Sequence, residues 1–335
     1  MTATGYSSSL PMELRGVNVV SVLVSGSIMH LRPDLLQWRG TLVYPVRSGG
    51  SHLLWFEATA HRCGGEMPDH IGRKGESMAH RITVIGAGTM GLGIAQVTAI
   101  HGIQTVLCDL SPEQLTAACC QIEASVEKGI EKGKNPVEAR DLLKSCLSTS
   151  TEVAEACQGS DFIIEAVPEV MQIKTKIFEE VEQVISEHAI LATNTSSLPI
   201  TKLSSGLTHP QRFVGMHFFN PVPIMALVEV VRGDQSSEAT IDAAVELAKK
   251  LGKEPIVVKD SPGFATSRLG LVLGLEAIRM LEAGVASAQE IDKAMELGYR
   301  HPMGPLRLTD LVGLDVRLAI AEYLHSMIGE QFRPP

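Results

Sequence analysis

From His80 onward, short apolar runs alternate with longer segments whose apolar residues recur every three to four positions. Runs rich in β-branched and aromatic residues predict buried strands, namely RITVI, QTVLC, DFIIEAV, AILAT, RFVGMHFF, LVEVV and PIVVKD. Helical spacing is shown by TMGLGIAQVTAIHG, SPEQLTAACCQIEASVEKGIEKGK and IKTKIFEEVEQVIS. Strands that alternate with helices predict an α/β domain over residues 80–260, built on a Rossmann-type, parallel, doubly wound sheet.

The pattern changes after Lys259, where the strand-like runs stop. The segments SPGFATSRLGLVLGLEAIRMLEAG, SAQEIDKAMELG and LDVRLAIAEYLHSMI all have helical spacing. They predict a second, smaller, all-α domain over residues 261–335. The segment HPMGP, residues 301–305, contains a histidine between a helix and prolines, and we interpret it as an interhelical turn rather than a reactive site.

Residues 1–79 follow neither period for more than a few positions. Glycine and serine are scattered through this segment, and its basic residues are six arginines and one lysine. VNVVSVLV and TLVYPV are candidates for short strands, but no other pattern joins them into a layer. We expect this segment to be disordered or loosely attached, or to be upstream sequence preceding a true start at Met78. A partner-binding arm is the alternative.

Composition narrows the function classes. The formal net charge of the 335 residues is -9, which argues against a nucleic-acid-binding surface. No apolar run approaches the roughly 20 residues of a membrane span, and the N-terminus lacks the pattern of a signal peptide. The six cysteines form no CxxC pair and no metal-ligand spacing, which predicts reduced thiols, no metal site and a cytoplasmic protein.

A glycine-rich motif follows the first predicted strand. GAGTMG fits the pattern GxGxxG and comprises Gly86, Ala87, Gly88, Thr89, Met90 and Gly91. Such glycines permit a tight turn, a close approach to pyrophosphate and close helix–strand packing, and the helix N-terminus favours an anion. Asp109 ends the next predicted strand, where a carboxylate accepts hydrogen bonds from ribose hydroxyls and repels a 2′-phosphate. The motif therefore predicts NAD rather than NADP as the cofactor.

Two ionisable residues lie inside the mostly apolar stretch GMHFFNPVPIMALVEVV, which begins at Gly215. They are His217 and Glu229, and burial makes the charge of either one costly unless it is compensated. An imidazole titrates near neutral pH and is a common general base. Taken alone, His217 is better interpreted as a hydrogen-bonded core histidine.

Three further motifs accompany the glycine loop: NTSSLPI (Asn194–Ile200), HFFNP around His217, and KDSPGF (Lys259–Phe264). Together they resemble the 3-hydroxyacyl-CoA dehydrogenase family, and most of all its bacterial 3-hydroxybutyryl-CoA dehydrogenases. The resemblance covers about residues 80–330. It implies an NAD-dependent oxidoreductase of fatty acid or butanoate metabolism, which moves hydride between NAD and the 3-hydroxyl of a short L-3-hydroxyacyl-CoA. It also implies a homodimer formed through the helical domain.

The resemblance assigns catalytic roles to four residues. His217 matches the family's base, and Glu229 has the spacing of the carboxylate that orients this base. Ser196 and Asn220 match positions near the reacting oxygens of the substrate. The alternatives are a helix cap for Ser196 and a turn-forming role for Asn220 before Pro221.

The resemblance also assigns binding roles. Glu169 and Lys174 match cofactor contacts, although without the family they would be interpreted as a solvated helix face. Ser125 and Lys132 match positions that meet coenzyme A, with plain surface residues as the alternative. Ser267 stands where the family usually has an asparagine that contacts substrate, so we expect altered affinity and a water-mediated contact.

The chain stops at Pro335, whereas family members usually continue, so we expect a truncated helical domain. Two other functions stay open at this point. One is a dehydrogenase of a free sugar acid, because the same fold can host that chemistry. The other is a non-catalytic NAD-binding remnant of the family.

Overall fold

The computed structural model describes residues 20–24, 27–31, 41–47, 53–59 and 79–335. The chain divides into one unit over residues 1–74 and another over residues 75–335. In the first unit, β1 (Val20–Val24) and β2 (Ser27–Leu31) form an antiparallel pair, as do β3 (Thr41–Arg47) and β4 (Leu53–Thr59). The predicted short strands correspond to β1 and β3, whereas β2 and β4 were not predicted. The prediction of disorder otherwise concerns residues outside the described ranges.

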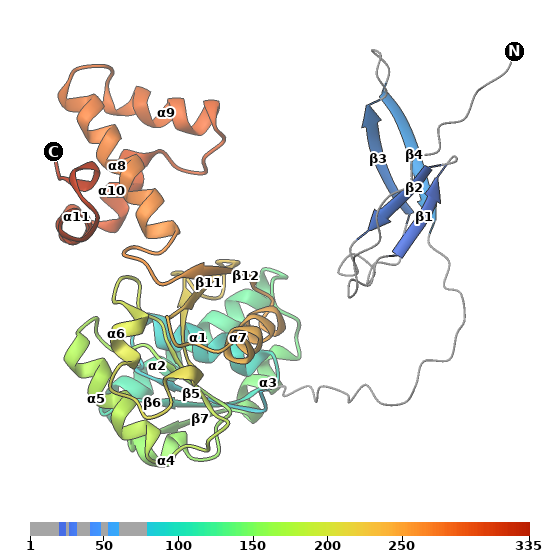
Figure 1. Cartoon of the computed structure of the whole chain (residues 1–335). Coiled ribbons are helices and arrows are strands. Elements are labelled where there is room, and N and C mark those ends of the chain that lie inside the picture. Colours follow the sequence, from blue (N-terminus) through green and yellow to red (C-terminus); the bar gives the residue numbers. More distant parts are fainter. Residues whose placement is uncertain (1–19, 25–26, 32–40, 48–52, 60–78) are drawn as a thin grey trace, which may run out of the picture. The chain divides into compact units, whose positions relative to one another are not determined.

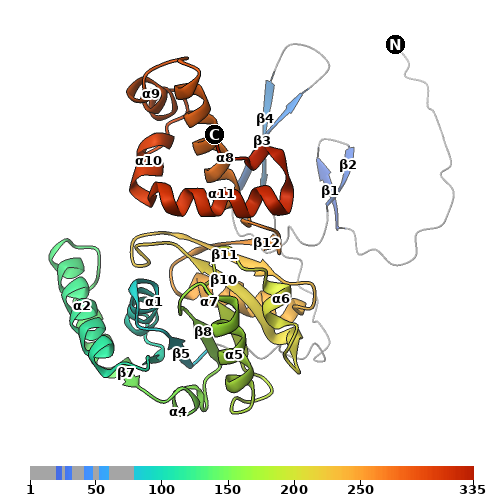
Figure 2. The same ribbon diagram turned by 90° about the vertical axis from the view of Figure 1, so that its left-hand side faces the viewer.

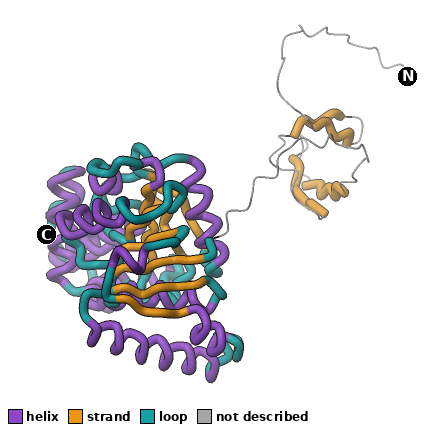
Figure 3. Tube along the Cα trace, turned by 90° about the horizontal axis from the view of Figure 1, so that it is seen from below, coloured by secondary structure: helices purple, strands orange, loops and turns teal. Residues whose placement is uncertain are grey.

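The second unit contains an eight-stranded sheet with the order β12-β11-β10-β9-β8-β5-β6-β7 (Figure 1 and Figure 3). The strands are β5 (Arg81–Ile85), β6 (Gln104–Cys108), β7 (Leu147–Ser150), β8 (Phe162–Glu165), β9 (Ile190–Thr193), β10 (Phe213–Phe218), β11 (Leu227–Arg232) and β12 (Glu254–Lys259). The first strand of the domain, β5, lies between β6 and β8, so the chain winds in both directions from the centre. The predicted doubly wound α/β fold is confirmed.

One strand pair departs from the predicted parallel arrangement. Strands β10 and β11 are antiparallel, whereas the other neighbouring pairs in this sheet are parallel. The physical reason lies in the connection, residues 219–226, which contains no helix. Parallel neighbours need a crossover that returns the chain to the other end of the sheet, and a short irregular loop cannot provide one.

Helices cover both faces of this sheet. They are α1 (Thr89–Ile100), α2 (Pro112–Glu131), α3 (Ala139–Cys146), α4 (Val153–Cys157), α5 (Met171–Glu182), α6 (Ile200–Ser204) and α7 (Glu238–Lys250). The predicted helices correspond to α1, α2 and α5, and α2 begins as expected, with Ser111 as its N-cap and Pro112 in its first turn. The shorter α3, α4 and α6, together with α7 and strand β7, were not predicted.

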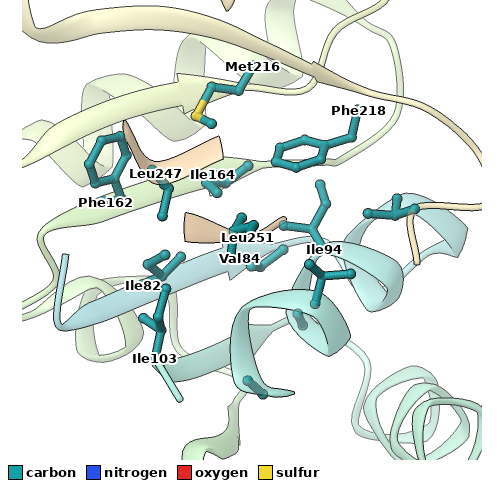
Figure 4. Packing of buried hydrophobic residues seen from close by; sticks show 14 of the residues in the cluster. Ile82, Val84, Ile94, Ile103, Phe162, Ile164, Met216, Phe218, Leu247 and Leu251 are labelled. Carbon is teal, nitrogen blue, oxygen red and sulfur yellow. The ribbon is translucent and has the colours of Figure 1, made fainter. Parts of the chain in front are cut away.

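Buried residues alternate between the two faces of the central strands. Ile82 and Val84 of β5 pack in the core that contains α1, α2, α3 and α7, where Ile94 and Leu247 meet them (Figure 4). Ile85, the next residue of β5, belongs to the core on the opposite face with α5 and α6. This alternation follows from the two-residue period of a strand. Both faces are therefore closed to water, and the open positions lie at the strand ends.

The C-terminal part is all-helical, as predicted. It consists of α8 (Thr266–Glu282), α9 (Ala288–Gly298), α10 (Pro305–Val312) and α11 (Leu314–Ile328), which group together beside β11 and β12 in Figure 2. A small core of its own includes Leu271, Leu275 and Phe332. The predicted turn at residues 301–305 connects α9 to α10, and Pro305 begins α10. Among the described helices, none combines the length and the apolarity needed to cross a bilayer.

Candidate active site

The glycine loop lies at the point where the chain direction across the sheet reverses, between the carboxyl ends of β5 and β8. Gly86 has a φ of 103°, and a Cβ there would lie 2.7 Å from the carbonyl oxygen of Ala166. A Cβ on Gly91 would lie only 1.7 Å from the carbonyl oxygen of Gly86. A Cβ on Gly88 would meet nothing within 4 Å. The first and third glycines are therefore required by packing, while Gly88 leaves room in front of the α1 N-terminus.

That open room fits the pyrophosphate of a dinucleotide. Gly88 is the N-cap of α1 and no side chain caps it, so the first backbone N–H groups of the helix stay available for an anion. Thr89 and Met90 begin the helix beside it. The residues present thus suit NAD, with backbone donors and a side-chain-free approach.

Asp109 ties the end of β6 to the glycine loop. Its Oδ2 accepts a hydrogen bond from the backbone N–H of Ala87 at 2.8 Å, and its Oδ1 accepts from the N–H of Ser111 at 3.0 Å. Gln114 supports the same loop by donating to the carbonyl oxygen of Ala87 at 2.9 Å. The carboxylate is half-buried and held at the cleft edge. Its contact with ribose stays a prediction.

A cavity of about 370 Å³ opens beside this loop. Its lining residues are Met90, Ala166, Val167, Glu169, Lys174, Asn194, Ser196, His217, Phe218, Phe219 and Asn220. These residues come from the start of α1, the ends of β8, β9 and β10, and helix α5. The cavity therefore unites the glycine motif with the predicted base and with the NTSS and HFFNP segments, which are far apart in the sequence.

His217 and Glu229 form a buried pair at this cavity. Nδ1 of His217 lies 2.7 Å from Oε2 of Glu229, and the two residues face each other directly across the antiparallel β10–β11 pair. Glu229 is 0% exposed and His217 is 7% exposed. A carboxylate at Nδ1 assigns the proton of a neutral imidazole to that atom and leaves Nε2 with its lone pair, so His217 can act as a base.

Glu229 is also held by the helical domain. Its Oε1 accepts hydrogen bonds from the backbone N–H groups of Ala265 at 3.1 Å and Thr266 at 2.9 Å, and its Oε2 accepts from the Thr266 hydroxyl at 2.9 Å. Burial opposes the charge of Glu229, but the hydrogen bonds from His217 and Thr266 prevail and hold its pKa below its ordinary value. Thr266 was not predicted. The only sequence signal for it is a hydroxyl residue where a helix begins.

Two aromatic rings border the imidazole. The ring centroid of Phe219 lies 4.4 Å from that of His217, and the centroid of Phe264 lies 6.0 Å from it. Phe264 has a φ of 45°, a left-handed conformation that non-glycine residues rarely adopt. These rings give the base an apolar surrounding next to the cavity.

A second charged cluster, besides the His217–Glu229 pair, lies at the cavity. It consists of Lys174 between two glutamates. Nζ of Lys174 lies 2.6 Å from Oε1 of Glu165 and 3.2 Å from Oε2 of Glu169. Lys174 is only 1% exposed, so the alternative of a solvated helix face does not apply to it. Glu165 was not predicted as a site residue. Its signal was an acid at the end of the otherwise apolar strand FIIE.

Glu169 fixes the loop that carries Ser196. Its Oε1 accepts hydrogen bonds from the backbone N–H groups of Ser196 at 3.0 Å and Ser197 at 3.2 Å, and from the hydroxyl of Thr195. Helix α6 has Pro199 as its N-cap, so the cap alternative for Ser196 is wrong. Ser196 therefore lies in a loop that is organised around a carboxylate and lines the cavity.

Asn220 lines the same cavity and precedes a cis peptide bond to Pro221. Nearby, Oδ1 of Asn194 accepts a hydrogen bond from the backbone N–H of Phe218 at 2.9 Å and so joins the end of β9 to that of β10. Asn194 was part of a quoted motif but had no predicted role. The turn-forming alternative for Asn220 stays compatible with its position.

Comparison with known proteins decides the family. The model described as 3-hydroxyacyl-CoA dehydrogenase, NAD binding domain, matches residues 81–261, and the one described as 3-hydroxyacyl-CoA dehydrogenase, C-terminal domain, matches residues 263–335. The chain belongs to the 3-hydroxyacyl-CoA dehydrogenase family. The predicted family is thereby confirmed, and so are an NAD-linked oxidoreductase class and NAD as the cofactor.

Several individual members of the family are similar to this chain. The 3-hydroxybutyryl-CoA dehydrogenase of Clostridioides difficile is 42% identical over 250 residues, which cover 75% of this chain and 89% of the relative. The mitochondrial hydroxyacyl-coenzyme A dehydrogenase of Sus scrofa is 42% identical over 264 residues, covering 77% and 84%. The crystal structure of (S)-3-hydroxybutyryl-CoA dehydrogenase from Ralstonia eutropha superimposes with a TM-score of 0.74 at 40% identity, covering 76% of this chain and 90% of that one.

The remaining residues that the family resemblance singled out lie outside the cavity lining. Ser125 is half-buried on α2, and Lys132 is the exposed C-cap of that helix. Ser267 lies in the first turn of α8, directly after Thr266. The structure brings none of the three to the 370 Å³ cavity, so their contacts with a substrate stay predictions.

The cysteines in the described residues are free, and burial works against the reactivity of three of them. Burial raises the pKa of Cys108 to about 11 and that of Cys157 to about 12, and it also raises the pKa of Cys119. A protonated thiol is a poor nucleophile and a poor metal ligand. Within residues 79–335, no cluster of acidic, histidine and cysteine side chains could hold a metal ion.

Proposed function

We propose that this protein interconverts a short L-3-hydroxyacyl-CoA, such as 3-hydroxybutyryl-CoA, and its 3-oxoacyl thioester. The observation that carries the proposal is the His217–Glu229 pair at a cavity that also includes Met90 of the glycine motif. A base and a dinucleotide loop at one cavity suit the removal of a proton and a hydride from a single carbinol. The relatives named for 3-hydroxybutyryl-CoA support the short acyl chain.

His217 carries the proton chemistry in this proposal. In the oxidative direction, Nε2 accepts the proton of the substrate 3-hydroxyl, and Glu229 stabilises the imidazolium that forms. In the reductive direction, the imidazolium returns that proton to the 3-oxo oxygen. NAD, when bound, supplies the nicotinamide that exchanges hydride with the substrate.

The chain's other polar groups bind and orient the reactants. Gly88 and the α1 N-terminus hold the pyrophosphate, and Asp109 accepts from the ribose hydroxyls. Ser196 and Asn220 are neutral donors that orient the 3-oxygen from the cavity wall. Glu169 and Lys174 form the wall at the cofactor end.

Three residues outside the cavity complete the proposed substrate contacts. Ser125 and Lys132 on α2 meet the coenzyme A moiety, where an ammonium suits phosphate. Ser267 reaches the substrate through water because its side chain is shorter than asparagine.

We also propose a homodimer formed by the helical domain. Large apolar side chains are exposed on α8, α10 and α11, among them Leu269, Leu311 and Leu314 at 66%, 71% and 62% exposure. A group of this kind on one part of a surface is typical of a protein interface. The absence of paired cysteine motifs supports the cytoplasm as the location.

The test is NADH consumption by the purified full-length chain with acetoacetyl-CoA, beside a His217→Ala control. Turnover that disappears in the control supports the proposal. Equal turnover of free acetoacetate would contradict the thioester requirement and favour an acid dehydrogenase. NADH binding without turnover would favour the non-catalytic remnant.

A further inference from the structure

Glu165 is a fully buried acid that the proton chemistry at His217 does not use. It ends strand β8 and has 0% exposure. Its Oε1 accepts hydrogen bonds from the backbone N–H of Val167 at 2.7 Å and from Nζ of Lys174 at 2.6 Å. Its Oε2 accepts from the Thr193 hydroxyl at 2.6 Å. These donors compensate the cost of burying the acid, and they tie Glu165 to β9 and α5.

The partners of Glu165 indicate that it is ionised. Burial raises its pKa above the ordinary value, while Lys174 and the hydrogen bonds from Thr193 and Val167 act in the opposite direction. The Thr193 hydroxyl oxygen also accepts from the N–H of Thr195 at 3.3 Å, which directs its own proton toward Glu165. All three partners therefore donate, and a carboxylate rather than a carboxylic acid matches three donors.

Lys174 is shared between two carboxylates. Its ammonium contacts the fully buried Glu165 and also Glu169, which lines the cavity. Glu169 in turn accepts a hydrogen bond from the backbone N–H of Ser196. One ammonium between two carboxylates gives the group a net charge of −1. Both Glu169 and Lys174 line the cavity that contains His217, so this charge lies at the place where a carbinol and a nicotinamide must meet.

We propose that Glu165 is a positioning residue that anchors Lys174, and through it Glu169, and that its charge makes the cavity favour the oxidised cofactor. This inference rests on the proposed function, because that function places the nicotinamide beside His217. The nicotinamide of NAD⁺ is a cation and that of NADH is neutral. A fixed net negative charge in a low-dielectric wall therefore stabilises bound NAD⁺ relative to bound NADH.

The test compares the dissociation constants of NAD⁺ and NADH for the full-length chain and its variants. NADH binding is followed by its fluorescence, and NAD⁺ binding by displacement of NADH. In Glu165→Gln, we expect the Kd of NAD⁺ to rise roughly tenfold and that of NADH less than threefold, because only the oxidised ring senses the lost charge.

Glu182→Gln is the matched control. Glu182 is also a buried acid of the same domain, and it accepts from the N–H groups of Thr208 at 2.7 Å and His209 at 2.9 Å and pairs with Arg212. It is absent from the cavity lining. We expect this variant to lose thermal stability and to keep the ratio of the two dissociation constants. A Glu165→Gln variant that behaves like Glu182→Gln overturns the proposal.

A double variant tests the route through Lys174. In Lys174→Met, the fully buried Glu165 and the partly exposed Glu169 lack their shared cation, so Glu165 takes up a proton and the net charge of the group stays at −1. Adding Glu165→Gln to this background removes the need for that proton and leaves the charge unchanged. The ratio of the Kd of NAD⁺ to the Kd of NADH should therefore be the same in the double variant as in Lys174→Met. A rise in this ratio as large as that caused by Glu165→Gln alone would contradict the shared-ammonium arrangement.

A milder variant covers the case in which Glu165→Gln does not fold. Thr193→Val removes the donor to Oε2 and favours protonation of Glu165. The ratio of the Kd of NAD⁺ to the Kd of NADH should therefore rise, by a smaller factor than in Glu165→Gln. An unchanged ratio in a folded Thr193→Val variant counts against the proposal. These binding measurements stay interpretable without turnover, so failure of the proposed reaction is distinguishable from failure of this inference.

Discussion

Two glutamates with 0% exposure, Glu229 and Glu165, belong to the same active site, yet their pKa values shift in opposite directions. Burial opposes the charge of both. Glu229 receives hydrogen bonds from His217 and from the start of α8, and these hold its pKa below the ordinary value. Glu165 shares the Lys174 ammonium with Glu169, and burial leaves the pKa of Glu165 raised. Burial alone does not decide the charge of an acid. The charge also depends on how many groups donate to the acid and on whether those donors are shared with other acids.

The difference also separates two tasks. In the proposed reaction, Glu229 stabilises a charge that appears on His217 only transiently, and the donors from α8 keep Glu229 ionised for that task. Glu165 maintains a constant charge arrangement in the cavity wall. The predictions below test this division.

The largest effect is expected from removing the base. His217→Ala leaves Glu229 without its reacting partner, and kcat should fall by roughly 10³- to 10⁴-fold. The Kd of NADH should change little, because the proposed partner of His217 is the substrate hydroxyl and not the cofactor. Steady-state turnover with acetoacetyl-CoA and NADH fluorescence measure the two quantities. A comparable loss in both would contradict the assigned role.

Glu229→Gln should have the next largest effect. The amide keeps the shape but cannot stabilise an imidazolium, so kcat should fall on the order of 10²- to 10³-fold. The dependence of kcat on pH should also change, because the carboxylate no longer supports protonation of His217. Glu165→Gln should leave that pH dependence unchanged. If both variants shift it equally, the division between the two glutamates is wrong.

Thr266→Val tests the contribution of the helical domain. It removes the hydroxyl donor to Oε2 of Glu229 but keeps the backbone donors, so kcat should fall roughly tenfold or less. Thr309→Val is the matched control, since Thr309 is a buried threonine of the same domain whose hydroxyl donates to the carbonyl oxygen of Pro305. The control should lose stability without loss of kcat. Equal kcat values in the two variants would argue against a contribution of α8 to the His217–Glu229 pair.

The smallest effect concerns stability against pH. The folded-state pKa of Glu229 lies below its ordinary value of 4.5, so its stabilisation is complete above pH 4.5 and is lost as the pH falls through the folded value. The pKa of Glu165 in the folded state lies above 4.5. The folded state therefore gains relative stability as the pH falls through that raised pKa toward 4.5. Urea unfolding at a series of pH values measures the free energy of unfolding of wild type and of each variant. The difference between wild type and Glu229→Gln should increase with pH below 4.5, whereas the difference between wild type and Glu165→Gln should decrease with pH above 4.5. Slopes of the same sign would contradict the comparison.

Much of the fold was predictable because local patterns carry it. The apolar runs predicted β5, β6 and β8 to β12, and Ser111 with Pro112 marked the start of α2. The glycine loop was recognisable because its spacing reflects backbone geometry close in sequence: packing requires Gly86 and Gly91, and Gly88 leaves room at the start of α1. Short helices such as α4 and α6 were missed, because five residues are too few to show a helical period.

The sequence by itself determined the family and the cofactor class and proposed His217 as the base, because these depend on residue types in contiguous motifs. Only the tertiary structure decided which groups charge and orient that base. The antiparallel turn of β11 sets Glu229 opposite His217, and the first turn of α8 then brings Thr266 to the same carboxylate. The role of Glu165 likewise depends on Thr193 and Lys174, which arrive from other elements. Electrostatic partnership is set by distance in space, and a linear pattern records only distance along the chain.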